Sequence, residues 1–132
     1  MIDSGGLIVD TGGQLAFLPA DVALSVMGAT HIVPVPGLEP PAVGLTLAED
    51  RAVAAIRIGS WPGGEMILCR VDGVLVTLVG AKVVASGRFP ARQGGVAWQS
   101  RLAETLDVRP LLLRAEAAIW EARAVPEDGR RT

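Results

Sequence analysis

Short apolar runs separated by glycine and proline recur along the first hundred residues of the chain. Gly12-Gly13 and Asp72-Gly73 each stand between two such runs, and these pairs supply the positive φ that a tight β-turn needs. The pattern therefore predicts two β-hairpins. They would join Leu7–Val9 to Leu15–Leu18 and Met66–Val71 to Val74–Val79.

Two more strands are expected in "AVGLTL" and "RAVAAIRIG", joined through Ala48-Glu49-Asp50. The segment "PADVALSVMG" after Leu18 fits either one helical turn or a bent strand. Strands spaced by 8 to 12 residues, without long helices between them, are typical of a barrel or a sandwich. We expect a mainly β domain.

The period of the pattern changes near the C-terminus. "RPLLLRAEAAIWEARA" contains no glycine, and its apolar residues recur at helical spacing. This predicts a helix over Pro110–Ala124, with Pro110 at the first helical position, where its missing N–H costs nothing. We expect a single domain over 1–125 and a polar, frayed tail over 126–132.

Composition and charge narrow the function classes. Half of the 132 residues are apolar and the net charge is −2, so the chain can build one core and offers no basic surface for nucleic acid. A solitary Cys69 fits a reducing compartment. The start of the chain lacks a basic segment and a long apolar run, so we expect a cytoplasmic protein without direct membrane insertion.

"LIVDTGG" is the most suggestive catalytic motif, because Asp10-Thr11-Gly12 resembles the active-site loop of aspartic proteases. In that family two aspartates share a proton. The chain has one such triplet, so a retroviral-type protease would have to be a homodimer using Asp10. The same residues are also ordinary turn formers, and a hairpin turn is the other interpretation.

The sequence gives only weak indications of a nucleophilic catalytic site, a metal site or a phosphate-binding loop. Cys69 and the single histidine, His31, could pair as nucleophile and base, but the apolar run around Cys69 favours a buried thiol. One histidine and one cysteine do not make a metal site. The glycine pairs lack the Lys-Ser or Lys-Thr of a phosphate loop. We expect no enzyme activity and no cofactor.

The order of the apolar motifs resembles the CheW-like family of chemosensory coupling proteins. The resemblance spans residues 7–112 and depends on the order and spacing of weak motifs. They are "QLAFLPADVALSVM", "VPVPGLEPPAVGLTL", "RAVAAIRIG", "MILCRVDGVLVTLVGAKVVASGRF" and "LDVRPLL". The chain departs from the family at Ala48-Glu49-Asp50, where a Leu-Arg-Gly turn is usual, and at Arg57, where an aspartate is usual.

The resemblance implies two small SH3-like five-stranded barrels with a groove between them, followed here by the C-terminal helix. Its members are non-enzymatic adaptors that couple chemoreceptors to a histidine kinase. One barrel meets the regulatory domain of the kinase, and the groove meets the cytoplasmic tip of the receptor. Val35, Pro36, Gly37, Gly44 and Arg57 are the residues expected to support or flank these contact surfaces. The alternative is another β-barrel module for protein interaction or assembly.

Overall fold

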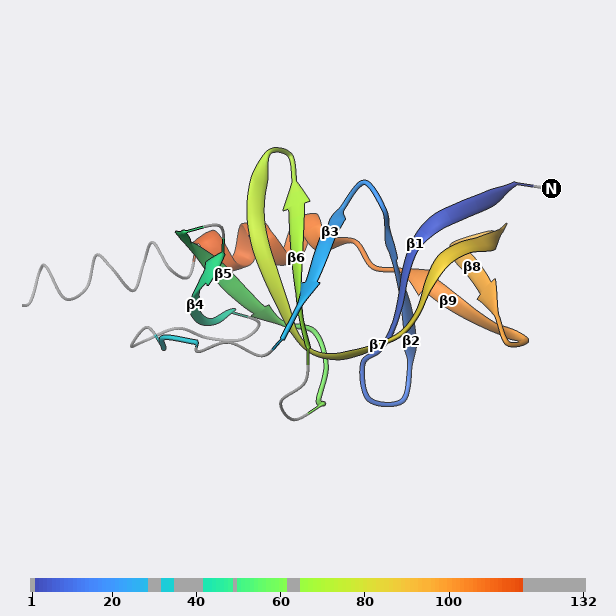
Figure 1. Cartoon of the computed structure of the whole chain (residues 1–132), viewed down its shortest axis with the longest axis horizontal. Helices are drawn as coiled ribbons and strands as arrows, with labels where there is room; N and C mark the ends of the chain where they lie inside the picture. The colour runs from blue at the N-terminus through green and yellow to red at the C-terminus, as the bar shows by residue number, and fades with distance from the viewer. Residues whose placement is uncertain (1, 29–31, 35–41, 49, 62–64, 118–132) are drawn as a thin grey trace, which may run out of the picture.

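Strands dominate the fold. The computed structural model describes residues 2–28, 32–34, 42–48, 50–61 and 65–117, and these ranges hold nine strands and a C-terminal helix over 108–117 (Figure 1). The strands are β1 (Asp3–Asp10), β2 (Leu15–Pro19), β3 (Ala23–Met27), β4 (Ala42–Ala48), β5 (Arg51–Arg57), β6 (Glu65–Val71), β7 (Val74–Arg92), β8 (Gly95–Trp98) and β9 (Arg101–Thr105). The predicted mainly β fold is confirmed.

Five strands close into a ring, which we call the closed barrel. Each pairs with the next in the order β1, β2, β9, β8, β7, and β7 returns to β1. Phe17 and Phe89 meet edge-to-face inside it, with ring centroids 6.3 Å apart. The buried residues of its core are Ile8, Leu15, Phe17, Phe89, Val96 and Ala103.

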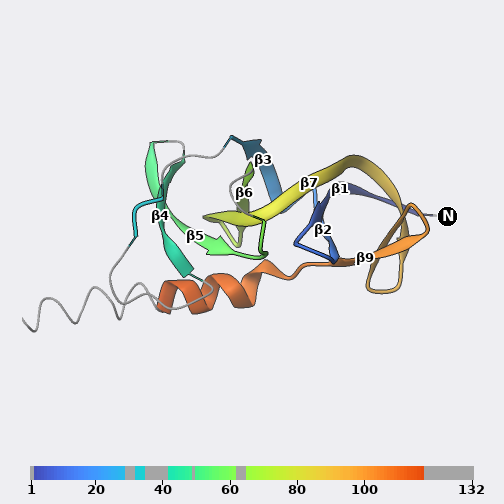
Figure 2. The same cartoon turned by 90° about the horizontal axis from the view of Figure 1, so that it is seen from below.

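The other strands form a second unit, the curled sheet, in the order β3, β6, β7, β5, β4. Figure 2 shows these strands bending around one another beside the closed barrel. Within the described residues its two outer strands, β3 and β4, do not pair with each other. One half of the molecule is therefore a closed ring of strands. Among the described residues, the other half is an open sheet with β3 and β4 as its edge strands.

The 19-residue strand β7 belongs to both units. Its first part pairs with β5 and β6, and the part from Lys82 to Arg92 pairs with β1 and β8. Gly80 at φ +88° and Gly87 at φ +141° adopt backbone angles that other residues rarely take. These glycines let the strand change direction without breaking. The sequence predicted a strand only to Val79, and it did not place β8 and β9.

A central core lies between the two units because β1 and β2 bury both of their faces. On β2, Leu15 and Phe17 point into the closed barrel, whereas Ala16 and Leu18 pack against residues of β5, β6 and β7. The C-terminal helix adds Val108, Leu112 and Ala115 to this core. The hairpin β1–β2 therefore joins the halves as firmly as the shared strand does.

Both predicted hairpins are confirmed, and so are the strands β4 and β5. The segment after Leu18 takes the bent-strand alternative, since the N–H of Val22 donates to the carbonyl of Pro19 in a turn that leads into β3. The helix begins at 108, two residues before the expected start. Asp107 caps it by accepting the N–H of Arg109, and Pro110 still lies in the first turn, where its missing N–H costs no hydrogen bond.

The expected end of the helix at Ala124 and the tail 126–132 lie outside the described residues. Most of the proline-rich connector between β3 and β4, residues 28–41, lies outside them as well. The described part of the helix has the predicted buried face, with Leu112 and Ala115 inside and Glu116 exposed.

Candidate interaction surface

Of the five residues expected near a contact surface, two are described. Gly44 lies on β4 and Arg57 at the end of β5. Val35, Pro36 and Gly37 lie outside the described residues, as does His31. The structure pairs Gly44 with Ala55, two residues before Arg57, so Gly44 and Arg57 lie near the same end of the β4–β5 hairpin.

Gly44 is where the connector touches the curled sheet. Its φ is +151°, and a Cβ there would collide with the carbonyl oxygen of Val33 and lie 2.9 Å from Cγ2 of Ile32. Val33 and Leu45 exchange backbone hydrogen bonds of 2.7 and 2.9 Å beside this contact. A glycine is therefore needed for residues 32–34 to lie against β4.

Arg57 is exposed, and its Nη1 donates to the carbonyl of Gly59 at 3.5 Å. It lies where β5 leaves its parallel pairing with β7, opposite Val79. The guanidinium thus stays at the surface, at the end of β5.

Asp10 serves the turn between β1 and β2. The N–H groups of Gly12 and Gly13 donate to its Oδ1 at 2.8 and 3.0 Å. Hydrogen bonds from Gly13 and Gly12 hold the pKa of this carboxyl below its usual value. Both oxygen contacts are made within the hairpin turn itself, which is the role that the turn interpretation assigns to Asp10.

Cys69 is fully buried in the central core, and burial raises the pKa of its thiol to about 12. The thiol is therefore protonated near neutral pH and is a poor nucleophile. The described residues contain no cluster of three or more metal-ligating side chains. Among them there is also no helix with the length and hydropathy of a bilayer span.

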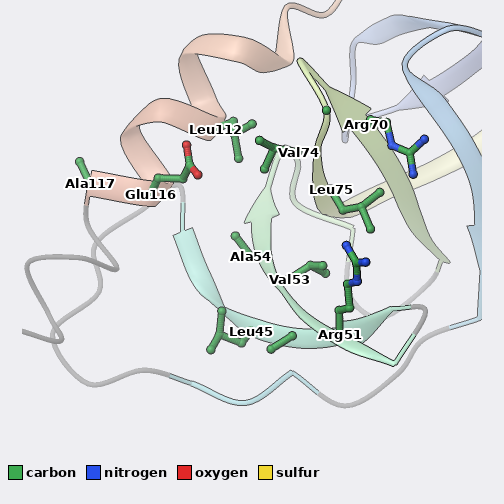
Figure 3. Close-up of a pocket in the computed structure, with 12 residues that line it drawn as sticks. Leu45, Arg51, Val53, Ala54, Arg70, Val74, Leu75, Leu112, Glu116 and Ala117 are labelled. Carbon is green, nitrogen blue, oxygen red and sulfur yellow. The ribbon is translucent and has the colours of Figure 1, made fainter.

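A cleft of about 980 Å³ opens in the curled sheet. The parallel strands β5 and β7 pair only from Ala54 opposite Val76 onward. Before that point, Arg51–Val53 pair with β4 alone, and Val74 and Leu75 pair with β6 alone. The two hairpins diverge there, and the C-terminal helix closes a third side (Figure 3).

The cleft combines apolar walls with charged side chains. Val53, Val74, Leu75 and Leu112 supply apolar surface, and Val74 is 39% exposed. Arg51 and Arg70 stand on the strands, and Glu116 stands on the helix. Figure 3 shows Leu75 between the side chains of the two arginines in this view.

No pattern in the sequence predicted this cleft. Arg70 interrupts the apolar run of Met66–Val71 and Arg51 opens a strand, and each reads alone as a solvated charge. Both arginines line the same cleft only because β5 and β6 lie on either side of β7. The separation of β5 from β7 depends on how distant segments pack together, so no local sequence pattern predicts it. An arginine within an apolar strand was the one local signal.

A second cleft, of about 440 Å³, lies between the closed barrel and the curled sheet. Residues from both units line it, together with the link from β9 into the helix. They are Pro19, Val22, Val71, Thr105, Leu106, Asp107, Val108 and Arg109. We call this cleft the groove, because it lies where the resemblance implies one.

Five of the eight large apolar side chains that are exposed among the described residues lie on the curled sheet and its connector. They are Leu24 and Val26 on β3, Val33 in the connector, Leu47 on β4 and Val74 on β7. The other three are Ile2 before β1, Leu102 on β9 and Leu113 on the helix. Singly exposed apolar side chains are common on protein surfaces, so these positions by themselves assign no contact surface.

A comparison with solved structures finds a protein of the same fold. The crystal structure of the scaffolding protein TtCheW from Thermoanaerobacter tengcongensis superposes with a TM-score of 0.68 at 10% sequence identity. The match covers 82% of this chain and 86% of that one. No family model and no curated protein sequence matches the chain. The chain therefore shares the fold of a scaffolding protein whose sequence is very different.

Proposed function

We propose that this protein is a CheW-like adaptor that couples chemoreceptors to a histidine kinase. The observation that carries the proposal is the fold match to a scaffolding protein over more than four-fifths of both chains. The order of motifs along the sequence points to the same family. An adaptor works by binding alone, which suits a molecule whose cysteine is buried and whose Asp10 holds a turn.

In this proposal the groove takes the coiled-coil tip of a receptor. It suits that partner because it is lined from both units and by the start of the helix, so that one bound rod touches all three. One of the two units contacts the regulatory domain of the kinase. The function needs no cofactor and takes place in the cytoplasm.

Val35, Pro36, Gly37, Gly44 and Arg57 support or flank the contact surface in this proposal. The packing of Val33 against Gly44 favours such a role, because it fixes the path by which the connector reaches β4. Arg57, where the family usually has aspartate, would select a partner with a different charge at that point.

Co-purification tests the coupling role. The full chain is mixed with the regulatory domain of a chemosensory kinase and with a receptor cytoplasmic fragment, both from the same genome, and complexes are separated by size. The proposal expects a complex with each and a ternary complex with both. Absence of binding to every kinase and receptor encoded there would refute the coupling role and leave the fold unaffected.

A variant in the groove sharpens that test. Thr105 lines the groove and is exposed, so Thr105→Arg places a long cation where the receptor would lie. Receptor binding should fall at least tenfold, a loss of about 1.4 kcal/mol, while kinase binding stays unchanged. Ser86→Arg, at an exposed position of β7 that does not line the groove, is the matched control.

A further inference from the structure

The cleft between β5 and β7 has the features of a binding site for an extended polypeptide. Along Arg51–Val53 and along Val74–Leu75, the sides that face each other across the cleft have no strand partner among the described residues. Open strand edges offer backbone donors and acceptors to an added strand. The cleft is too wide there for the two edges to pair with one another.

Its arginines are available for a ligand. The guanidinium groups of Arg51 and Arg70 form no hydrogen bond or ion pair with any described residue. Other arginines are engaged: Arg109 pairs with Asp72, and Arg88 donates to the carbonyl of Asp3. Two exposed guanidinium groups without a partner in the described part of the chain therefore flank an apolar cleft in a protein whose net charge is −2.

The apolar side chains near the two arginines determine which other residues of a ligand fit the cleft. Val53, Val74 and Leu75 present aliphatic surface, so aliphatic side chains would lose their water there. Carboxylates suit guanidinium groups because the planar fork donates two parallel hydrogen bonds. Glu116 stands on the helix side, so the acidic residues of a ligand would face the strands and not the helix.

We infer that this cleft binds an extended, acidic and aliphatic segment of a partner protein, adding it as a strand with its carboxylates on Arg51 and Arg70. This site is separate from the groove, and its occupant is a peptide segment and not a folded coiled coil. The inference is independent of the coupling role, because it is tested with synthetic peptides instead of chemosensory proteins.

The test selects ligands from a library of short random peptides displayed on phage, with the purified full chain as bait. Enriched peptides should alternate aliphatic residues with Asp or Glu. The binding of one such synthetic peptide should weaken at least tenfold with Arg51→Glu and with Arg70→Glu. It should also weaken as salt rises from about 0.1 M to about 1 M.

Two controls separate a specific site from general charge attraction. Arg92→Glu changes an exposed arginine on the closed barrel and should leave peptide binding unchanged. A peptide with Lys in place of its acidic residues should bind the double variant Arg51→Glu, Arg70→Glu more tightly than it binds the natural chain. Glu116→Gln should keep or slightly improve binding of the acidic peptide.

Three results would overturn the inference. They are a selection without acidic peptides, equal binding to the natural chain and to both single charge reversals, and self-association of the chain that either reversal abolishes. The last would put a second copy of this chain in the cleft instead of a partner segment.

Discussion

The closed barrel and the curled sheet are built from similar numbers of strands and share β7, yet they differ in how completely their strands are paired. In the barrel every strand has two paired neighbours, and an aromatic pair fills the interior. In the curled sheet β5 and β7 are apart at their starts and pair only over the four residues from Ala54 and Val76 onward. The difference lies in how the strand edges are treated: every strand of the barrel is paired on both sides, whereas among the described residues β5 and β7 keep unpaired edges beside the cleft.

The two interior cores give the largest test of this comparison. Phe17→Ala should lower the free energy of unfolding by about 3–5 kcal/mol, because the closed ring cannot collapse onto the cavity. Leu68→Ala in the curled sheet should cost about 2 kcal/mol, since Val53 and Leu75 of its cluster border the open cleft and can shift.

Urea unfolding measures both variants, with Leu102→Ala at an exposed position of the barrel as the control. A larger loss for Leu68→Ala than for Phe17→Ala would contradict the comparison.

Gly44→Ala tests how the connector is held on the curled sheet. Both Gly44 at φ +151° and Gly87 at φ +141° have backbone angles that cost alanine about 1–3 kcal/mol. Only at Gly44 would the added Cβ also collide with neighbouring backbone. Gly44→Ala should therefore destabilise the protein by about 1–2 kcal/mol more than Gly87→Ala does.

Thermal and urea unfolding of the two glycine variants give this difference directly. Equal losses would mean that residues 32–34 move away from β4 at no cost, and that Gly44 does not fix the connector.

Asp10 tests the barrel through pH. Its pKa is lower in the folded protein than the ordinary 3.8, so its charge contributes stability above that value, and this contribution is lost as pH falls through the folded pKa. Asp10→Asn keeps an oxygen that accepts the two N–H groups but removes the charge, so the variant should be slightly less stable at neutral pH and should lose less stability than the natural chain as pH falls below 3.8.

Unfolding curves at several acidic pH values check this prediction. An unchanged acid dependence in Asp10→Asn would show that the turn hydrogen bonds do not stabilise the carboxylate.

The smallest expected effect concerns the link between the curled sheet and the helix. Arg109 donates to both carboxylate oxygens of Asp72 at 3.0 Å, but both side chains are more than 60% exposed. A double-mutant cycle with Asp72→Asn and Arg109→Gln should give a coupling of about 0.5 kcal/mol that high salt removes. A coupling of several kcal/mol would mean that this ion pair holds the cleft in shape.

Local chemistry was enough to predict the parts of the fold that depend on neighbours in sequence. Gly12-Gly13 and Asp72-Gly73 place two hairpins because turn residues act over a few positions. The helix start was wrong by two residues, since proline fits several positions of a first turn and Asp107 decides which one it takes. The mainly β class followed from the same local signals.

The pairings between distant strands were not accessible from a pattern of apolar runs. The predicted strand Val74–Val79 stops just before Gly80, whereas in the structure Gly80 and Gly87 bend a single strand that continues to Arg92 and belongs to both units. The parallel pairs β2–β9 and β5–β7 join segments far apart in the chain, and the cleft exists only where the second of these pairs ends. The family resemblance implied a groove between the two units. The cleft between β5 and β7 was seen only in the structure.

The way β7 is shared also sets an order of assembly during synthesis. Residues 23–81 contain every strand pairing of the curled sheet, so this unit can begin to form as soon as they leave the ribosome. The first hairpin emerges earlier, but β1 gains its second partner only from residues 82–90, and β2 gains its second partner only from β9. We therefore expect the closed barrel to be completed after the curled sheet, although its first two strands are synthesised before it.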